Sequence, residues 1–260
     1  MASTPTDDPL VYRPMTLPPR RALDRGAPFD WLSEGWHYFN RNPSVSIAYG
    51  AAFASIGILI TWLGLEQPQF VLTFWTGFLL VGPLLAMGLY RIAQLDDRGE
   101  HTSLSACWGV LRHRLGSVAL FTLLLSLVMI AWIRFSTIAA ALYIGNIAGS
   151  SGFIAALATP EGFGFLLVLF GTGAVFAALM FALTAWSLPL VLDGRTDFGR
   201  AVLTSVRATV EQPLPMLTWG AIVAVLTVLG MITFFAAFLV IFPWLGYSTW
   251  AAYRDLFGEA

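Results

Sequence analysis

The chain has 260 residues, of which 57% are hydrophobic and 11% are charged, and its formal net charge is −1. Soluble domains carry about 25% charged residues, so this chain has too few polar side chains to cover a surface in water, and a membrane protein is predicted. All fourteen basic residues are arginine, which excludes chemistry that needs lysine, such as a Schiff base or a Walker A phosphate loop. The single cysteine, Cys107, excludes an internal disulfide and a CxxC site.

The N-terminal segment, residues 1–27, is rich in Pro, Thr, Asp and Arg and contains no apolar run. Such a composition is typical of a flexible tail. The first long apolar stretch begins near Val45, too late in the chain for a cleaved signal peptide. We therefore expect a flexible cytoplasmic tail over 1–27, followed by a single membrane domain over 28–257.

Five apolar stretches follow the tail. They cover residues 44–64, 69–93, 115–144, 162–192 and 214–253. A helix needs about 20 residues to cross a bilayer, so the last stretch is too long for one helix and fits a tight hairpin. The expected fold class is all-α, a polytopic membrane helix bundle with six transmembrane helices.

The arginines predict the orientation of these six helices. Thirteen of the fourteen fall before the first apolar stretch, in the loops around 91–114 and 193–213, or at the C-terminal end, which all lie on one side; Arg134 alone lies near the other. Because positively charged loops stay in the cytoplasm, both termini are predicted to be cytoplasmic. The expected location is the bacterial inner membrane.

A short amphipathic stretch precedes each odd-numbered span, at 29–43, 103–115 and 197–213. Each stretch is predicted to form a short helix in the headgroup region, with its apolar face toward the membrane and arginine toward phosphate. The pattern of one interfacial helix and two spans occurs three times. It predicts a weak three-fold internal repeat, over about 28–95, 103–193 and 197–257.

The even-numbered spans share a proline between apolar residues, at Pro83, Pro189 and Pro243. Proline removes a backbone N–H donor in a helix interior and so is expected to kink these spans. Two interpretations stay open: the kinks serve helix packing, or they are hinges. The faces Gly145–Gly149 and Gly220–Ala224 carry small residues four apart, which favour close approach of helices.

Ionisable side chains are absent from the middle of the six predicted spans, and the three histidines lie outside them. This argues against a proton relay, a sodium-coupled carrier and a haem held between spans. No catalytic residue, metal site or cofactor is predicted. The densest ionisable group is Asp96, Asp97, Glu100 and His101, which we interpret as a solvated turn, with a cytoplasmic metal or hydrolytic site as the alternative.

The candidate lipid or ligand contacts share one property: each is a polar residue near the end of a predicted span. Arg134 either reaches the outer headgroups or faces an outward-opening cavity with Asn146 and binds an anionic headgroup. At the cytoplasmic side, contact with anionic lipid is predicted for Arg41, Arg112, Arg114 and Arg207. Nucleic-acid binding is not supported, because fifteen acidic residues balance the arginines.

Four motifs carry a family resemblance: GWHYFNRNP at 35–43, GLYRIAQLDDRGE at 88–100, AWIRF at 131–135 and PWLGYSTWAAYRDL at 243–256. Together they resemble bacterial predicted integral membrane proteins, the domain of unknown function 2189, over roughly residues 20–257. The resemblance implies a multi-span bacterial inner-membrane protein with no assigned activity. Some members carry the label cytochrome c oxidase subunit I. The missing intramembrane histidines contradict that chemistry and leave only an accessory relation to a respiratory complex.

The expected function is a non-catalytic scaffold, assembly or accessory protein. Its expected partners are membrane lipids, a second copy of itself, or a respiratory or other membrane complex. The alternative is a transporter or binder of lipid or apolar small molecules, because a neutral cargo needs no buried charge.

Overall fold

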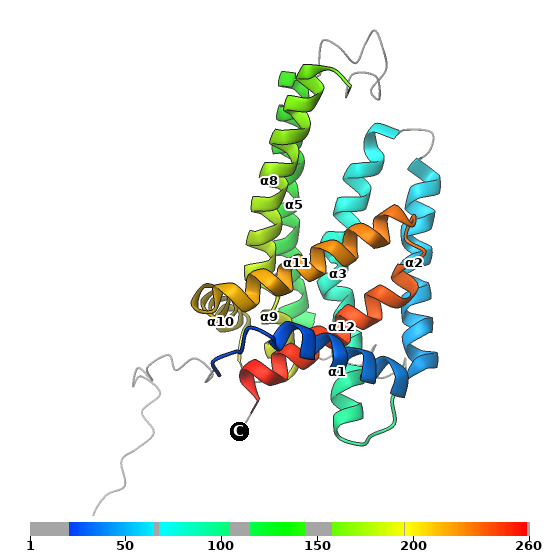
Figure 1. The fold of residues 1–260 in the computed structure, drawn as a ribbon, viewed down its shortest axis with the longest axis vertical. Helices are drawn as coiled ribbons and strands as arrows, with labels where there is room; N and C mark the ends of the chain where they lie inside the picture. The colour runs from blue at the N-terminus through cyan, green and yellow to red at the C-terminus, as the bar shows by residue number, and fades with distance from the viewer. Residues whose placement is uncertain (1–20, 65–67, 104–114, 144–157, 195, 259–260) are drawn as a thin grey trace, which may run out of the picture.

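The computed structural model describes residues 21–64, 68–103, 115–143, 158–194 and 196–258. All regular secondary structure in these residues is helical (Figure 1). The helices are α1 (Ala27–Arg41), α2 (Pro43–Gly64), α3 (Pro68–Asp97), α5 (Leu115–Tyr143), α8 (Pro160–Thr184), α9 (Ser187–Leu192), α10 (Phe198–Glu211), α11 (Pro213–Ile232) and α12 (Phe238–Phe257).

Four stretches among the described residues are helical, long enough and apolar enough to cross a membrane. They are Pro43–Leu63, Gly116–Tyr143, Pro160–Leu192 and Pro213–Ile232. The all-helical class and several candidate spans are thus confirmed, whereas the count of six spans and the three-fold repeat stay predictions. The expected hairpin within 214–253 is present, because a turn at 233–237 separates α11 from α12.

Two of the three predicted amphipathic helices lie in the described residues. The first is α1, and Pro43 begins α2 directly after it. The third is α10, whose N-terminus is capped by the Asp197 side chain, which accepts from the Arg200 N–H at 2.9 Å. The second, at 103–115, falls almost wholly outside the described residues.

The three prolines occupy different helical positions. Pro189 has no N–H group to donate to the carbonyl oxygen of Ala185, four residues earlier. The chain leaves the α-helix at Ala185–Trp186, between α8 and α9. Pro83 and Pro243 lie inside α3 and α12, which continue through them. A helix break is therefore confirmed at Pro189, and the use of any of the three as a hinge stays a prediction.

Helix α12 forms the centre of the core, with thirteen of its twenty residues buried. It packs against α1, α2 and α3, and glycines allow the helices to approach closely. A β-carbon at Gly35 would overlap Ser248, one at Gly50 would overlap the Leu239 carbonyl oxygen, and one at Gly246 would crowd Leu89. At Gly220, by contrast, a β-carbon would meet nothing within 4 Å. The close approach predicted for Gly220–Ala224 is therefore wrong within this chain.

Helices α5 and α8 pack against each other and rise beside the other helices as a pair, which we call the arm (Figure 1). Within an 18-residue apolar segment of each candidate span, only 11% of the residues in α5 and 6% of those in the stretch that begins with α8 are buried, against 28% in α2 and 22% in α11. The arm therefore presents most of its apolar surface outward.

Candidate functional site

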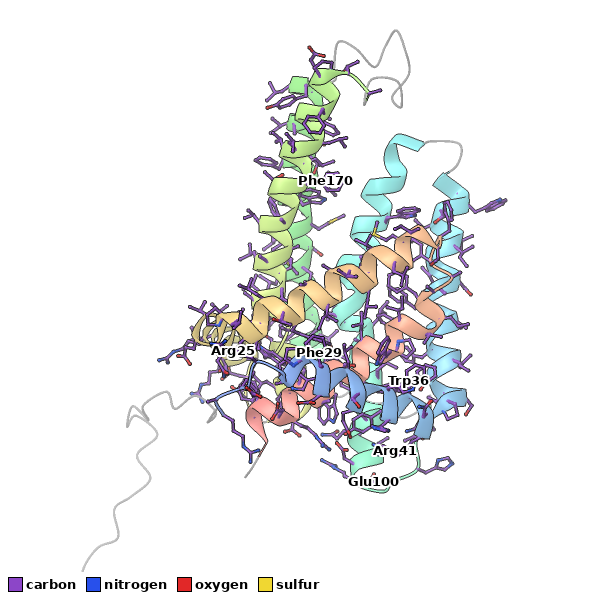
Figure 2. All side chains as sticks on the ribbon, viewed as in Figure 1. Arg25, Phe29, Trp36, Arg41, Glu100 and Phe170 are labelled. Carbon is purple, nitrogen blue, oxygen red and sulfur yellow. The ribbon has the colours of Figure 1, made fainter. Side chains whose placement is uncertain are left out.

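The most polar constellation among the described residues lies where α3, α9 and α12 end. We call it the carboxylate network and define it by Asp96, Asp97, Asp193 and Asp255 with their donors. Figure 2 shows the labelled Arg41 and Glu100 at this end of the molecule and Phe170 high on the arm. We call this side of the molecule the network end.

Asp97, the last residue of α3, joins three helices. Its Oδ1 accepts from the Tyr38 hydroxyl of α1 and lies 2.5 Å from Nη1 of Arg254. Its Oδ2 accepts from the indole N–H of Trp250 at 2.9 Å. The Asp97 side chain is 21% exposed. One carboxylate therefore ties α3 to α1 and α12.

Asp96 holds the junction of α1 and α2. Its Oδ2 lies 2.7 Å from Nε of Arg41, and its Oδ1 accepts from the Asn42 amide at 3.0 Å. The Asn42 Oδ1 in turn accepts from the Thr102 hydroxyl at 2.6 Å. Asp96 thus links the end of α3 to the point where the chain leaves α1 for α2.

Asp193 and Asp255 make the corresponding links for α9 and α12. Asp193 accepts from the Tyr253 hydroxyl at 2.8 Å and from the Gln94 amide at 3.1 Å. Asp255 accepts from the indole N–H of Trp31 at 2.8 Å. The ends of α3, α9 and α12 are therefore each fixed by an acidic residue that a distant helix supplies with donors.

The electrostatics of the network keep its donors protonated. Burial and the hydrogen bond to Asp97 raise the pKa of Tyr38 well above its usual value. For Arg254, burial lowers the pKa, but the hydrogen bond to Asp97 and the neighbouring charges outweigh it and leave a raised pKa. At neutral pH, Tyr38 is an uncharged donor and Arg254 a full cation, so the arrangement suits a structural clamp.

The interpretation of Asp96 and Asp97 as parts of a solvated turn is wrong, because both carboxylates are bound by side chains of other helices. Glu100 and His101 are exposed, as a turn requires. In the described part of the chain, no three His, Cys, Asp or Glu side chains lie together as metal ligands would. The sequence signal that was missed is the pair of carboxylates at the end of an apolar helix.

Beside the network lies a cluster of buried indoles. Trp31 packs edge-to-face against Trp186 at 6.1 Å and against Trp219 at 5.7 Å between ring centroids. All three side chains are almost fully buried. The three rings come from α1, the break between α8 and α9, and α11, so the cluster joins all three predicted repeats in one core.

The predicted lipid contacts are scattered. Arg41 is paired with Asp96, and Arg207 pairs with Glu211 at 3.3 Å on the exposed side of α10. Arg134 is exposed on α5. Three of the candidates, Asn146, Arg112 and Arg114, lie outside the described residues. The structure brings none of the described candidates together into one site.

Residues 70–193 match the model of a family described as predicted integral membrane protein (DUF2189). This part of the chain belongs to that family. The chain is therefore an integral membrane protein. The resemblance to DUF2189 drawn from the sequence is confirmed over residues 70–193, whereas its extension over residues 20–257 and the bacterial origin stay predictions. No curated protein and no solved structure matches the chain.

The DUF2189 match begins in α3 and ends at Asp193. It includes three of the four network carboxylates, Asp96, Asp97 and Asp193. Their donors on α1 and α12, including Tyr38 and Arg254, lie outside the matched residues. The clamp is thus formed between the family segment and the flanking parts of this chain.

Proposed function

We propose that this protein is a non-catalytic scaffold or accessory protein of the bacterial inner membrane, with six membrane-embedded helices and both termini in the cytoplasm. The observation that carries the proposal is the arm. Two long helices that bury little of their apolar surface in their own chain offer a large area to another membrane protein or to a second copy.

One face of α5 is suited to such a contact. Leu120, Leu123, Leu127 and Ile130 are exposed and recur at intervals of three and four residues, so they form one stripe along the helix. Arg134 follows Ile130 by four residues and extends the same stripe with a cation. We expect the stripe to contact a partner helix and Arg134 to meet an acidic group or an anionic headgroup near the outer end of that contact.

Mass spectrometry of the protein gently extracted from its native membrane tests this function. We expect a stoichiometric protein partner that is lost when Leu123, Leu127 and Ile130 are replaced together by alanine. The matched control replaces Leu217, Val225 and Val228 of α11, which are equally exposed, by alanine and should keep the partner. Equal loss in both variants would contradict a role of the arm. A single enriched lipid or apolar molecule without a protein would favour the transporter.

The orientation has its own test. The carboxylate network gathers Arg41 and Arg254 at the end that we assign to the cytoplasm, as the positive-inside rule expects. A reporter enzyme that is active only in the cytoplasm, fused after Ala260, should be active. Activity of a periplasm-specific reporter at the same position would overturn the assignment.

A further inference from the structure

The turn between α11 and α12 does not reach the C-terminal end of α2, which is the end remote from the carboxylate network. A β-carbon at Gly57 of α2 would overlap the ring of Phe235, so the turn is in direct contact with that position. Gly57 precedes the end of α2 at Gly64 by seven residues, about 10 Å along a helix. On α3, the Phe235 ring lies 5.5 Å from Trp75 and 5.8 Å from Phe78. Both helices therefore extend beyond the turn.

Helix α12 reaches the network end within a few residues of this turn. The indole N–H of Trp244 already donates to the Leu32 carbonyl oxygen of α1 at 2.8 Å, and Tyr247 and Asp255 continue the contact with α1. Only Phe238–Pro243 lies between the turn and α1, which is about 9 Å of helix. The hydrocarbon core is about 30 Å thick. The part of α12 between the turn and α1 is therefore too short to cross it.

The turn satisfies its own backbone donors. The N–H groups of residues 233–236, 238 and 239 each donate to a carbonyl oxygen within the hairpin, at 2.9 to 3.2 Å. The N–H of Ala237 donates to the Thr233 hydroxyl oxygen at 3.0 Å. Backbone polar groups inside hydrocarbon must be satisfied within the protein, and these bonds satisfy the N–H groups of the turn.

The side chains of the turn are also suited to hydrocarbon. Its sequence, TFFAA, contains no charged residue, glycine or asparagine, whereas Glu66 and Glu161 lie in or beside the connections after α2 and α5. Phe234 and Phe235 have φ values of 50° and 70°, which are unfavourable for any residue but glycine. The ring of Phe235 is fully buried and holds this conformation. The Phe234 ring lies edge-to-face against Trp75 at 6.3 Å between ring centroids, and the Phe234 side chain is still 63% exposed.

We propose that α11 and α12 form a re-entrant hairpin that enters the membrane from the network end and turns back inside the hydrocarbon, with Phe234 in contact with lipid acyl chains. The proposal rests on the orientation given under the proposed function and refines it, since two of the six embedded helices do not reach the outer surface. The partner of this surface is the lipid interior.

Cysteine labelling tests the depth of the turn. In the full chain with Cys107→Ser, cysteine is introduced singly by Phe234→Cys, by Ile232→Cys as a second tip position, and by Glu161→Cys and Glu100→Cys as controls for the two sides. A membrane-impermeant maleimide is applied to intact cells and then to ruptured membranes. We expect Glu161→Cys to react in intact cells and Glu100→Cys only after rupture.

Both tip variants are expected to show loss of labelling in intact cells and in ruptured membranes, and full labelling after denaturation in detergent. A nitroxide attached at either tip position should collide more with oxygen than with a polar nickel complex. Labelling of the tip in intact cells would overturn the proposal in favour of a complete crossing, and labelling only after rupture would place the hairpin at the surface. Swapped labelling of the two controls would overturn the orientation, while shielding of the tip would still support the re-entrant turn.

Discussion

Replacing Gly50 by valine is expected to destabilise the protein more than any other single substitution in α2. A β-carbon at this position would overlap the carbonyl oxygen of Leu239, which is backbone and can move only if α12 moves. Overpacking typically costs about 1–3 kcal/mol, and a clash with backbone belongs at the upper end. The expected loss of about 3 kcal/mol lowers the melting temperature in detergent by roughly 10 °C, as measured by intrinsic fluorescence during heating.

The matched control for this substitution is Gly220→Val. Gly220 also lies in a long apolar helix, but a β-carbon there meets nothing within 4 Å. Its melting temperature should stay near that of the unchanged protein, because substitutions without a steric conflict usually change stability by less than about 0.5 kcal/mol. Equal losses in the two variants would mean that glycine as such, and not the crossing of α2 and α12, determines stability.

Replacing Asp97 by asparagine is expected to have the second-largest effect. The carboxylate accepts from Tyr38 and Trp250 and pairs with Arg254, so asparagine removes the charge that Arg254 faces and turns an amide donor toward other donors. Breaking a buried pair costs about 3–5 kcal/mol. Because the Arg254 side chain is 45% exposed and partly screened by solvent, about 2–3 kcal/mol is expected. Thermal unfolding in detergent measures this loss.

Glu211→Gln is the control for Asp97→Asn. Glu211 pairs with Arg207 at 3.3 Å, and both side chains are about half exposed. Surface pairs of this kind contribute roughly 0–1 kcal/mol, so a shift of at most a few degrees is expected. If the two variants lost similar stability, the carboxylate at the end of α3 would be an ordinary surface charge and not the link between α1, α3 and α12.

Much of the secondary structure was predictable because it depends on local sequence. The apolar stretches were sufficient to place α2, α5 and α11, and the length of 214–253 required a turn that the structure places at 233–237. Amphipathic spacing located α1 and α10, and Pro43, the first residue of α2, marked the boundary with α1. These features follow from hydropathy and from backbone chemistry within one or two helical turns.

The network was not predictable from the same signals. Asp97 accepts from Trp250, which is 153 residues away in the chain, and Asp255 accepts from Trp31 at a separation of 224. Nothing in the local sequence says which donor will reach a carboxylate at a helix end. Spacing of small residues was equally ambiguous, since it favoured Gly220 when the close contacts lie at Gly35, Gly50 and Gly57.

The sequence by itself determined that this protein is helical and belongs in a membrane, since both properties add up residue by residue along the chain. The tertiary structure alone decided that Asp96 and Asp97 hold helices together and that the arm exposes its apolar faces. It also decided how far the turn after α11 extends along α2. These outcomes depend on which helices pack together and at which positions along their lengths. A contact between helices that are distant in the chain produces no periodic pattern in the sequence of either helix.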